Sequence, residues 1–500
     1  MNKNISKKLA KRKKKISKML SKRDWDEQPA PMFKASNIQY EIDGRLQGIA
    51  PGGIGLIHIL AKKTGLLKEI DKDLELLKRH LPYHESDHVA NMAYNILAGG
   101  TCLQDIELLR NNEAWLNALG AEVIPDPTTA GDFLRRFSIE DIITMLDIKN
   151  TIRKKVWEKQ PENFKKEAII NIDGTISETT GECKQGMDIS YNGKWGYAPL
   201  VVSLEKTREP LYIINRSGNA PSHLGSATWV DKTLDLLDGT FKKLYVRGDT
   251  DFSLTSNFDK WDQRCTFVFG MDARSNLIKI ADSLSDSCWQ IFEKQMQAIK
   301  TSPRKRPENV KLQVVKKRNF KRLETACEHI AEFEYKPGKC RQPYRMVVLR
   351  KTINEYKGER LLFDDIRYFF YITNDWKKSA RQLVCFYRKR ADHENDIDQL
   401  KHGVHAMDNP SDSLNANWAY MVIASLAWDL KAWYGMMMPY RSLGLSIVRM
   451  EFKRFIQTFI NIPCLIIRSG RRIKYRIIAY NNRLISMFTF FDFLKTVWVT

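Results

Sequence analysis

The sequence lacks several patterns that mark common classes of protein. None of its eight cysteines stands in a C-x-x-C pair, so neither a zinc ribbon nor a redox-active dithiol is indicated. The first 23 residues contain no apolar run, which argues against a signal peptide or a membrane anchor there. The most apolar stretch, residues 421–438, is interrupted by Asp429 and Lys431, so it predicts a buried helix and no membrane span. A cytoplasmic protein with reduced thiols and no membrane partner is expected.

Acidic residues are scarce relative to basic ones. Lys and Arg total 81 against 59 Asp and Glu, a formal net charge of +22. Residues 1–23 hold eleven of the basic residues and no acidic residue. An excess of this size indicates a polyanionic partner, either nucleic acid or an anionic membrane surface. We expect residues 1–30 to be a disordered basic arm, which either stays solvated or contacts DNA phosphates non-specifically.

The 500 residues are enough for more than one domain. Residues 31–165 are expected to be mainly helical, and Asp126 has the character of an N-cap before a helix that carries Arg135 and Arg136. Short helices with a basic last helix are typical of DNA-reading units and equally of simple packing units. Both interpretations stay open, and Arg135 and Arg136 are the candidate DNA-binding residues of this region.

The composition changes near residue 167. Residues 168–173 form a short apolar run that ends in Asp173, and residues 243–249 form another that ends in Asp249. Each run predicts a strand, and further strands with an intervening helix predict an α/β sheet. Those further elements are strands at residues 197–204 and 211–214 and a helix at residues 229–237.

Residues 269–365 are expected to be a mainly β insertion in this sheet domain. They contain a basic cluster, from which Lys316, Lys317 and Arg318 are candidate DNA-binding residues. A solvated surface is the plain alternative for such a charge run. Strands are predicted at residues 310–315, 329–335, 344–350 and 368–373, long helices at 380–402 and 413–436, and a basic hairpin at 464–480 that turns at Gly470.

Carboxylates at the ends of neighbouring strands meet at one edge of a sheet. Their hard oxygens select Mg²⁺ or Mn²⁺, and two such ions can activate a nucleophile and stabilise a leaving oxygen in phosphoryl transfer. Asp173 and Asp249 are by themselves a weak signal, because an Asp after a strand is often only a turn residue or a helix cap.

A third element strengthens the metal-site interpretation. Tyr387, Arg390, Glu394 and Lys401 lie at offsets 0, 3, 7 and 14 of a predicted helix, so they share one narrow face. This face combines an aromatic hydroxyl, two cations and a carboxylate, which suits a DNA backbone near a metal site. The alternative is a surface salt bridge, since Arg390 and Glu394 are four residues apart.

This pattern resembles the C-terminal signature Y-x2-R-x3-E-x6-K of bacterial insertion-sequence DDE transposases. The segments around Asp173 (Ile172-Asp173-Gly174-Thr175) and Asp249 (Arg247-Gly248-Asp249-Thr250) resemble the two Asp motifs of that group, and Arg216-Ser217-Gly218-Asn219 resembles a motif between them. The sequence upstream of Asp173 is similar to the N-terminal part of the insertion-sequence family numbered thirteen-eighty. The residues that carry this similarity are Ala98-Gly99-Gly100, Asp105, Leu109-Arg110 and Asp126-Pro127-Thr128-Thr129. The resemblance covers residues 35–440.

The resemblance implies an RNase H-like catalytic core at residues 166–268 and 366–440, followed by a basic C-terminal region at 441–500. It implies that Asp173, Asp249 and Glu394 are catalytic and hold two Mg²⁺ ions, with Mn²⁺ able to substitute. Tyr387, Arg390 and Lys401 would then grip the DNA end. The expected partners are terminal inverted repeats and target DNA, bound by a homodimer in a synaptic complex within a bacterial, nucleoid-associated cytoplasm.

Several residues compete with this assignment. Asp251 stands where the family has a small residue, and Asp398 lies on the same helix face, but neither matches the motifs. His393, His402 and His405 cluster nearby without a Cys partner or an H-E-x-x-H pattern, so they do not indicate zinc.

The expected activity is cleavage at the ends of the element by water, followed by attack of the freed 3′-hydroxyl on target DNA. A catalytically inactive or repurposed transposase that only binds DNA is the alternative, and a nuclease that cuts without joining is a third possibility.

Overall fold

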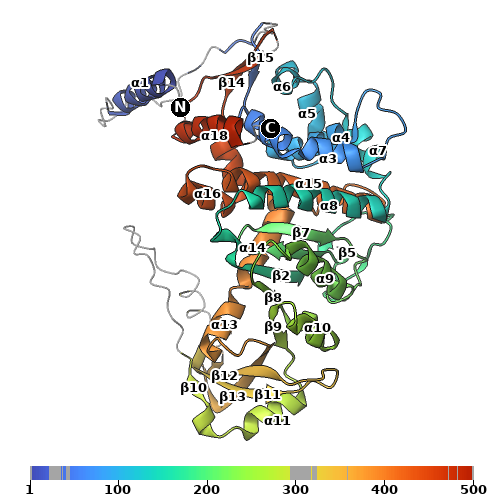
Figure 1. Ribbon diagram of the computed structural model, residues 1–500, viewed down its shortest axis with the longest axis vertical. Coiled ribbons are helices and arrows are strands. Elements are labelled where there is room, and N and C mark those ends of the chain that lie inside the picture. The colour runs from blue at the N-terminus through green and yellow to red at the C-terminus, as the bar shows by residue number, and fades with distance from the viewer. Residues whose placement is uncertain are drawn as a thin grey trace.

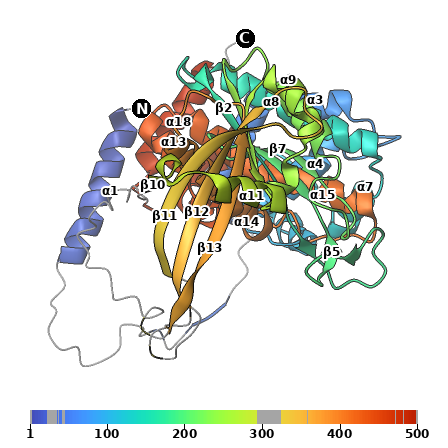
Figure 2. The same ribbon diagram turned by 90° about the horizontal axis from the view of Figure 1, so that it is seen from below.

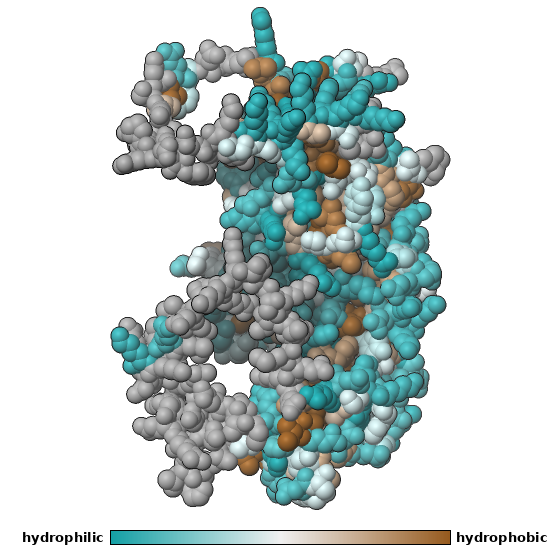
Figure 3. Space-filling view, turned by 90° about the vertical axis from the view of Figure 1, so that its left-hand side faces the viewer, coloured by the Kyte–Doolittle hydropathy of each residue, from teal (hydrophilic) through white to brown (hydrophobic). Residues whose placement is uncertain are grey.

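The computed structural model describes residues 3–21, 35, 38–40, 45–292, 313, 317, 324–356, 359–470, 472–480 and 482–497. The molecule is elongated, with helices at one end and a long curved sheet at the other (Figures 1 and 2). One face is mostly hydrophilic, and its hydrophobic side chains lie in small separate patches (Figure 3). No helix in the described part combines the length and apolar character that crossing a membrane requires.

A nine-stranded mixed sheet forms the centre, in the order β10-β11-β12-β13-β9-β8-β2-β6-β7. Strand β2 pairs antiparallel with β6 and parallel with β8, and β8 is parallel to β9. Every residue of β6 and β7 is buried, which explains why both strands are mainly apolar, with Ser203 and Glu209 as the polar exceptions. The strands of this half are β2 Ala168–Gly174, β6 Leu200–Leu204, β7 Glu209–Ile214, β8 Leu244–Gly248 and β9 Thr266–Met271.

Two long helices lie side by side along the β7 edge of the sheet, α8 (Ile139–Glu158) and α15 (Leu414–Met436) (Figure 1). Helix α15 is buried on nearly all sides and contains the apolar stretch expected to be a buried helix. Helix α9 (Ser226–Leu237) includes the helix predicted at residues 229–237. It follows β7 and precedes β8 in the sequence, and it packs against β2 and β6.

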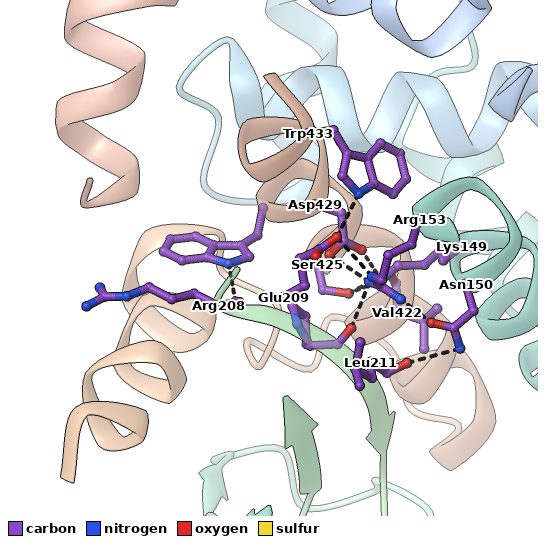
Figure 4. A network of polar contacts seen from close by, with 12 residues as sticks. Lys149, Asn150, Arg153, Arg208, Glu209, Leu211, Val422, Ser425, Asp429 and Trp433 are labelled. Atoms are coloured by element: carbon purple, nitrogen blue, oxygen red, sulfur yellow. Dashed lines mark hydrogen bonds and ion pairs between the residues drawn. The ribbon is translucent and has the colours of Figure 1, made fainter. Parts of the chain in front are cut away.

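A buried polar network joins these layers (Figure 4). Arg153 on α8 binds Glu209 on β7 at 3.0 Å and Asp429 on α15 at 2.9 Å, and all three side chains are 0% exposed. Lys149 binds the other oxygen of Asp429 at 3.0 Å, and the indole of Trp433 donates to Glu209. Buried charges are tolerated only when paired, so this network fixes how the two helices sit on the strand.

The segment expected as an insertion extends the same sheet and forms no separate layer. Strand β13 pairs antiparallel with β9, as expected for a return to the core, and β12 and β11 follow outward (Figure 2). The strand predicted at residues 310–315 lies mostly outside the described residues. The elements of this part are α10 Phe258–Asp262, α11 Ser275–Ser283, β10 Gln290–Ile291, β11 Glu324–Tyr335, β12 Tyr344–Tyr356 and β13 Glu359–Thr373.

The N-terminal helices cover α8 and α15 on the side away from the sheet, consistent with the mainly helical region expected there (Figure 1). Asp126 caps α7 as predicted, accepting from the Thr129 amide at 3.0 Å. These helices are α2 Ile54–Thr64, α3 Leu66–Asp73, α4 Glu85–Leu97, α5 Ile106–Arg110, α6 Glu113–Leu119 and α7 Pro127–Leu134.

A strand near the N-terminus pairs with a hairpin near the C-terminus. The predicted hairpin turning at Gly470 is present as β14 (Cys464–Ser469) and β15 (Arg472–Ile477), and β1 (Gly48–Ile49) adds to it. The other C-terminal elements are α16 Arg441–Val448, α17 Phe452–Phe455, the π-helical turn η7 Ile456–Ile460 and α18 Leu484–Val497.

Residues 3–21 form a helix, α1 (Lys3–Ser21), which differs from the disordered arm expected from their charge. Leu9 is 8% exposed and packs on the core together with Ile5, one helical turn earlier. Arg12 donates to the carbonyls of Ile477, the last residue of β15, and of Ala479. The apolar residues Ile5 and Leu9 on one side of the helix and these two hydrogen bonds hold α1 to the rest of the chain.

Candidate active site

Two strand ends deliver the first two carboxylates. Asp173 is the penultimate residue of β2, and Asp249 directly follows β8, which runs parallel to β2. Because the carboxyl ends of parallel neighbours share one edge of a sheet, both side chains lie at that edge. Asp249 also begins a 3₁₀ turn, where its carboxylate accepts from the Asp251 amide at 3.0 Å.

The third carboxylate comes from a segment that runs along the sheet beside β9, β8 and β2 (Figure 1). Glu394 lies in α14 (Ala391–Asp398) and its side chain is exposed. Its neighbour His393 is 0% exposed and hydrogen-bonds Ser203 of β6 at 2.9 Å, which anchors the helix to the sheet. This anchor turns Glu394 toward the edge that carries the aspartates, where its charge acts on Asp173.

The prediction of one continuous helix over residues 380–402 is wrong. Helix α13 (Ala380–Arg388) ends before a turn at Lys389 and Arg390, α14 follows, and residues 399–403 form a π-helical turn. The buried guanidinium of Arg247 donates to Asn171 of β2 at 2.9 Å and to the carbonyl of Phe386 at 2.7 Å. The last turn of α13 is thereby bound to the two strands that carry the aspartates.

Arg390 occupies the middle of the site. Its guanidinium lies 2.7 Å from Asp173, with both side chains largely buried at 17% and 13% exposed. Burial disfavours the charge of Arg390, but the charges of Asp173 and Asp249 raise its pKa above the ordinary value. Its Nε is buried without a hydrogen-bond partner in the described part of the chain.

The carboxylates are poorly compensated. Burial raises the pKa of Asp173 to about 7, Arg390 opposes the rise, and the charges of Asp249 and Glu394 increase it. Burial also raises the pKa of Asp249, against Arg390 and with the charge of Asp251. Carboxyl groups in a cleft whose pKa values are raised by burial and by neighbouring acids are candidates for a functional site.

Tyr387 completes the cluster. Its ring lies 4.7 Å from that of Tyr371, and its hydroxyl approaches Gly270 of β9 so closely that a Cβ there would stand 2.9 Å away. Burial raises the pKa of Tyr387, with Arg390 opposing. The phenol therefore stays protonated and can donate a hydrogen bond.

Lys401 lies apart from the carboxylates, on the π-helical turn, where its ammonium donates to the carbonyl of Ile176 at 2.7 Å. It lines a cavity of about 830 Å³ together with Thr175, Arg216 and Asp251. The structure thus brings Tyr387, Arg390 and Glu394 to the two aspartates and puts Lys401 in the adjoining cavity.

The three carboxylates could hold divalent cations, because hard oxygens in a site with excess negative charge suit Mg²⁺ or Mn²⁺. Among the described residues, their oxygens do not all lie within 4.8 Å of one another. Asp173 is paired with Arg390 at 2.7 Å.

The remaining candidate DNA-binding residues lie elsewhere. Arg135 pairs with Asp132 of α7 at 3.1 Å and with Asp412 before α15 at 3.2 Å, and Arg136 donates to the carbonyl of Leu76. Both arginines are exposed, as predicted. Lys317 is exposed, and the remaining two candidates, Lys316 and Arg318, lie outside the described residues.

The competing residues have separate partners. Asp398 pairs with His402 at 3.7 Å, and His405 pairs with Asp408 at 3.0 Å. His393, His402 and His405 therefore do not converge. Asp251 lines the cavity and raises the pKa of Asp249 without replacing it at the strand end.

The sequence analysis named Arg247 as part of the second Asp motif and His393 as a competing residue, but it did not predict that both anchor the site. Their burial follows from strand and helix placement. A charged residue inside an apolar strand, as in Tyr245-Val246-Arg247, was the available signal for Arg247.

The chain was compared with known families, curated proteins and solved structures. The chain matches the family described as transposase DDE domain group 1 over residues 30–486. A solved structure, a piggyBac transposase synaptic complex with hairpin DNA, shares 12% sequence identity with a TM-score of 0.34, covering 82% of this chain and 85% of that one. No curated protein matches. Since the family match spans most of the sequence, the chain belongs to the transposase DDE domain group 1 family.

Proposed function

We propose that the chain cuts DNA at the ends of an insertion sequence and joins those ends to target DNA, with Asp173, Asp249 and Glu394 as the catalytic carboxylates. The convergence of these three charges at one sheet edge carries the proposal. Members of the family generally use divalent metal ions. Mg²⁺, with Mn²⁺ as a substitute and two ions per site, suits an all-carboxylate ligand set.

An RNase H-like core is supported by strand order. The run β7-β6-β2-β8-β9 is antiparallel on one side of β2 and parallel on the other. Asp173 and Asp249 stand on the two central parallel strands, and Glu394 reaches the same edge from a helix. This topology supports the RNase H-like assignment.

The residues of the chain would divide the work as follows. When bound, the ions would activate the attacking oxygen and stabilise the leaving one. Tyr387 and Lys401 would orient the DNA backbone by hydrogen bonds to phosphate oxygens, Lys401 from within the adjoining cavity. Arg390, released from Asp173, would bind a phosphate through its fork of donors.

DNA contact outside the site would come from basic surfaces. Helix α1 presents nine basic residues and no acidic one, and its placement beside the C-terminal hairpin joins two basic segments. Arg135, Arg136 and the cluster with Lys316, Lys317 and Arg318 would add further phosphate contacts. Two DNA ends held by a homodimer would complete the synaptic complex.

The test uses linear DNA that carries the inverted repeats flanking the gene. In Mg²⁺ the parent protein should nick these ends and, with target DNA present, form joined products. Asp173→Asn and Glu394→Gln should each lower cleavage by at least about 10²-fold while leaving end binding intact. Strand transfer separates a transposase from a nuclease that only cuts.

The matched control is Asp398→Asn, an exposed carboxylate on the same helix that pairs with His402. It should leave cleavage unchanged. Asp251→Asn tests the neighbouring acid, which we expect to have a small effect compared with Asp249→Asn. Full cleavage by Asp173→Asn or Glu394→Gln would refute the site, and a parent protein that binds the ends but never cuts would indicate a repurposed DNA-binding protein.

A further inference from the structure

A second cluster of metal-ligating side chains lies in the N-terminal helical region, on different elements from the carboxylates. His80 lies within the loop between α3 and α4, His84 is the last residue of that loop, and Glu85 is the first residue of α4. One ligating atom from each of the three lies within 4.8 Å of the others. The two imidazole rings are stacked with centroids 4.2 Å apart, and His80 Nε2 is 3.0 Å from a Glu85 oxygen.

The carboxylate of this cluster is held in place by the backbone. Glu85 is 2% exposed in its side chain, and its Oε1 accepts from the amides of Leu76 and Leu77 at 3.1 and 2.9 Å. Its other oxygen is left for His80. A buried carboxylate oriented by two backbone donors behaves like the supported ligands of metal sites, whose geometry is set by hydrogen bonds to the ligand.

The histidines supply the other side of the site. His80 is 44% exposed and His84 is also exposed, so both can rotate by small amounts and an ion can reach them from solvent. The backbone amide of His84 donates to Asp87 at 2.9 Å, which fixes the start of α4 whether or not the imidazole has a ligand. The ligand positions are therefore preorganised on the carboxylate side and accessible on the histidine side.

We propose that His80, His84 and Glu85 form a binding site for a transition-metal dication of the Zn²⁺ class. Two imidazoles and one carboxylate are a ligand set that Zn²⁺ accepts, with water in the fourth position. Mg²⁺ prefers all-oxygen sites, so it would not compete here. This site differs in place and in chemistry from the carboxylates on the sheet edge, and it does not depend on the proposed function.

A bound ion would tie the loop at residues 74–84 to the first turn of α4. The loop borders a cavity of about 480 Å³ whose lining includes Lys78, Arg79 and Arg136. The carbonyl of Leu76, beside the Glu85 contacts, accepts from Arg136. Metal binding would therefore order a basic loop next to Arg136.

The experiment uses the full chain, stripped of metal with a chelator and kept in excess Mg²⁺ so that the carboxylate site does not take up the added ion. Calorimetric titration with Zn²⁺ should show one ion per chain. His80→Ala and His84→Ala should each weaken binding by at least about tenfold. Zn²⁺ should also slow tryptic cleavage after Lys78 and Arg79 in the parent and not in His84→Ala.

The matched control is His402→Ala, because His402 is also an exposed histidine beside a carboxylate but has a single such partner. It should bind Zn²⁺ as the parent does. Circular dichroism checks that each variant is folded, and Glu85→Gln offers a further variant whose amide oxygen can still accept from the Leu76 and Leu77 amides. A parent chain that binds no Zn²⁺, or binding that survives both histidine substitutions unchanged, would overturn the proposal.

Discussion

Asp173 shows how burial and charge compete in a single carboxyl group. Its contact with Arg390 at 2.7 Å would by itself lower a carboxyl pKa. Desolvation outweighs this attraction, and Asp249 and Glu394 add to the rise, so the pKa reaches about 7. The negative charge of Asp173 is therefore disfavoured in this environment, and a nearby divalent cation would stabilise it.

We expect Asp173→Asn to change the pH dependence of stability in metal-free protein. The ordinary pKa of the group is 3.8 and its folded pKa is about 7, so between these values the folded state binds more protons than the unfolded state. The contribution of Asp173 to the free energy of unfolding therefore falls as pH rises through this window and is constant above it. Asn does not titrate, so the urea midpoint of the variant minus that of the parent should increase from about pH 4 to about pH 7.

The exposed Asp398→Asn serves as the control for this measurement, and its difference from the parent should vary little over the same pH window. A difference between Asp173→Asn and the parent that stays constant with pH would show that Asp173 titrates normally.

At the scale of elements, the break between α13 and α14 determines how Glu394 reaches the aspartates. Sequence periodicity predicts one helix because Lys389 and Arg390 are themselves good helix formers. Arg247 and His393 fasten the segment to the strands on either side of the break. Tertiary contacts thus override local propensity at the place where the side chains must converge.

Arg247→Lys should lower cleavage while leaving DNA-end binding nearly unchanged. Lysine keeps the charge but has a single nitrogen in place of the two that donate to Asn171 and to the carbonyl of Phe386, so the end of α13 and the following turn should shift. A displacement of about 1 Å in a catalytic group costs about 10²-fold in rate. Single-turnover cleavage in Mg²⁺ measures the effect.

The control for Arg247→Lys is Arg264→Lys, whose guanidinium pairs with exposed Asp235 on the surface. Equal cleavage rates for Arg247→Lys and the control would mean that Arg247 has no positioning role.

At the scale of the whole molecule, the layers are joined by buried charge as well as by apolar packing. The network of Arg153, Glu209 and Asp429 links helices α8 and α15 to β7, the edge strand of the sheet (Figure 4). Such a network specifies one arrangement of helices on the strand, because any other leaves a charge buried and unpaired.

Asp429→Ala should lower the free energy of unfolding by about 3–5 kcal/mol, since it leaves Lys149 and Arg153 without this partner in the interior. Asp235→Ala, which removes an exposed ion pair with Arg264, should cost less than about 1 kcal/mol. Urea titration of the two variants measures both effects. Similar losses in the two would show that the buried network adds no more than a surface pair.

Much of the sheet could be predicted from the sequence. Apolar runs that end in Asp173 and Asp249 are strands because buried strands require continuous apolar residues, and both carboxylates lie where those runs end. The hairpin at Gly470 and the cap at Asp126 follow from turn and capping chemistry. These features depend on residues close together in the sequence.

Other features could not be predicted because they depend on distant contacts. Helix α1 has a charge pattern that suits a solvated tail, and it is ordered by Leu9 and Arg12 meeting the far end of the chain. The extension of the sheet by β11 and β12 depends on the pairing of β13 with β9, about a hundred residues earlier. The His80, His84 and Glu85 cluster is local in sequence, but it depends on how the loop at residues 74–84 folds back on the start of α4, which no periodicity predicts.

The sequence by itself determined which carboxylates stand at strand ends and which basic and aromatic residues accompany Glu394, because period and apolar content act locally. Only the tertiary structure decided that Arg390 pairs with Asp173, that Arg247 binds the end of α13, and that Lys401 lines the adjoining cavity. Those outcomes depend on burial and on the distance between charges, and both arise only when separate segments of the chain pack together.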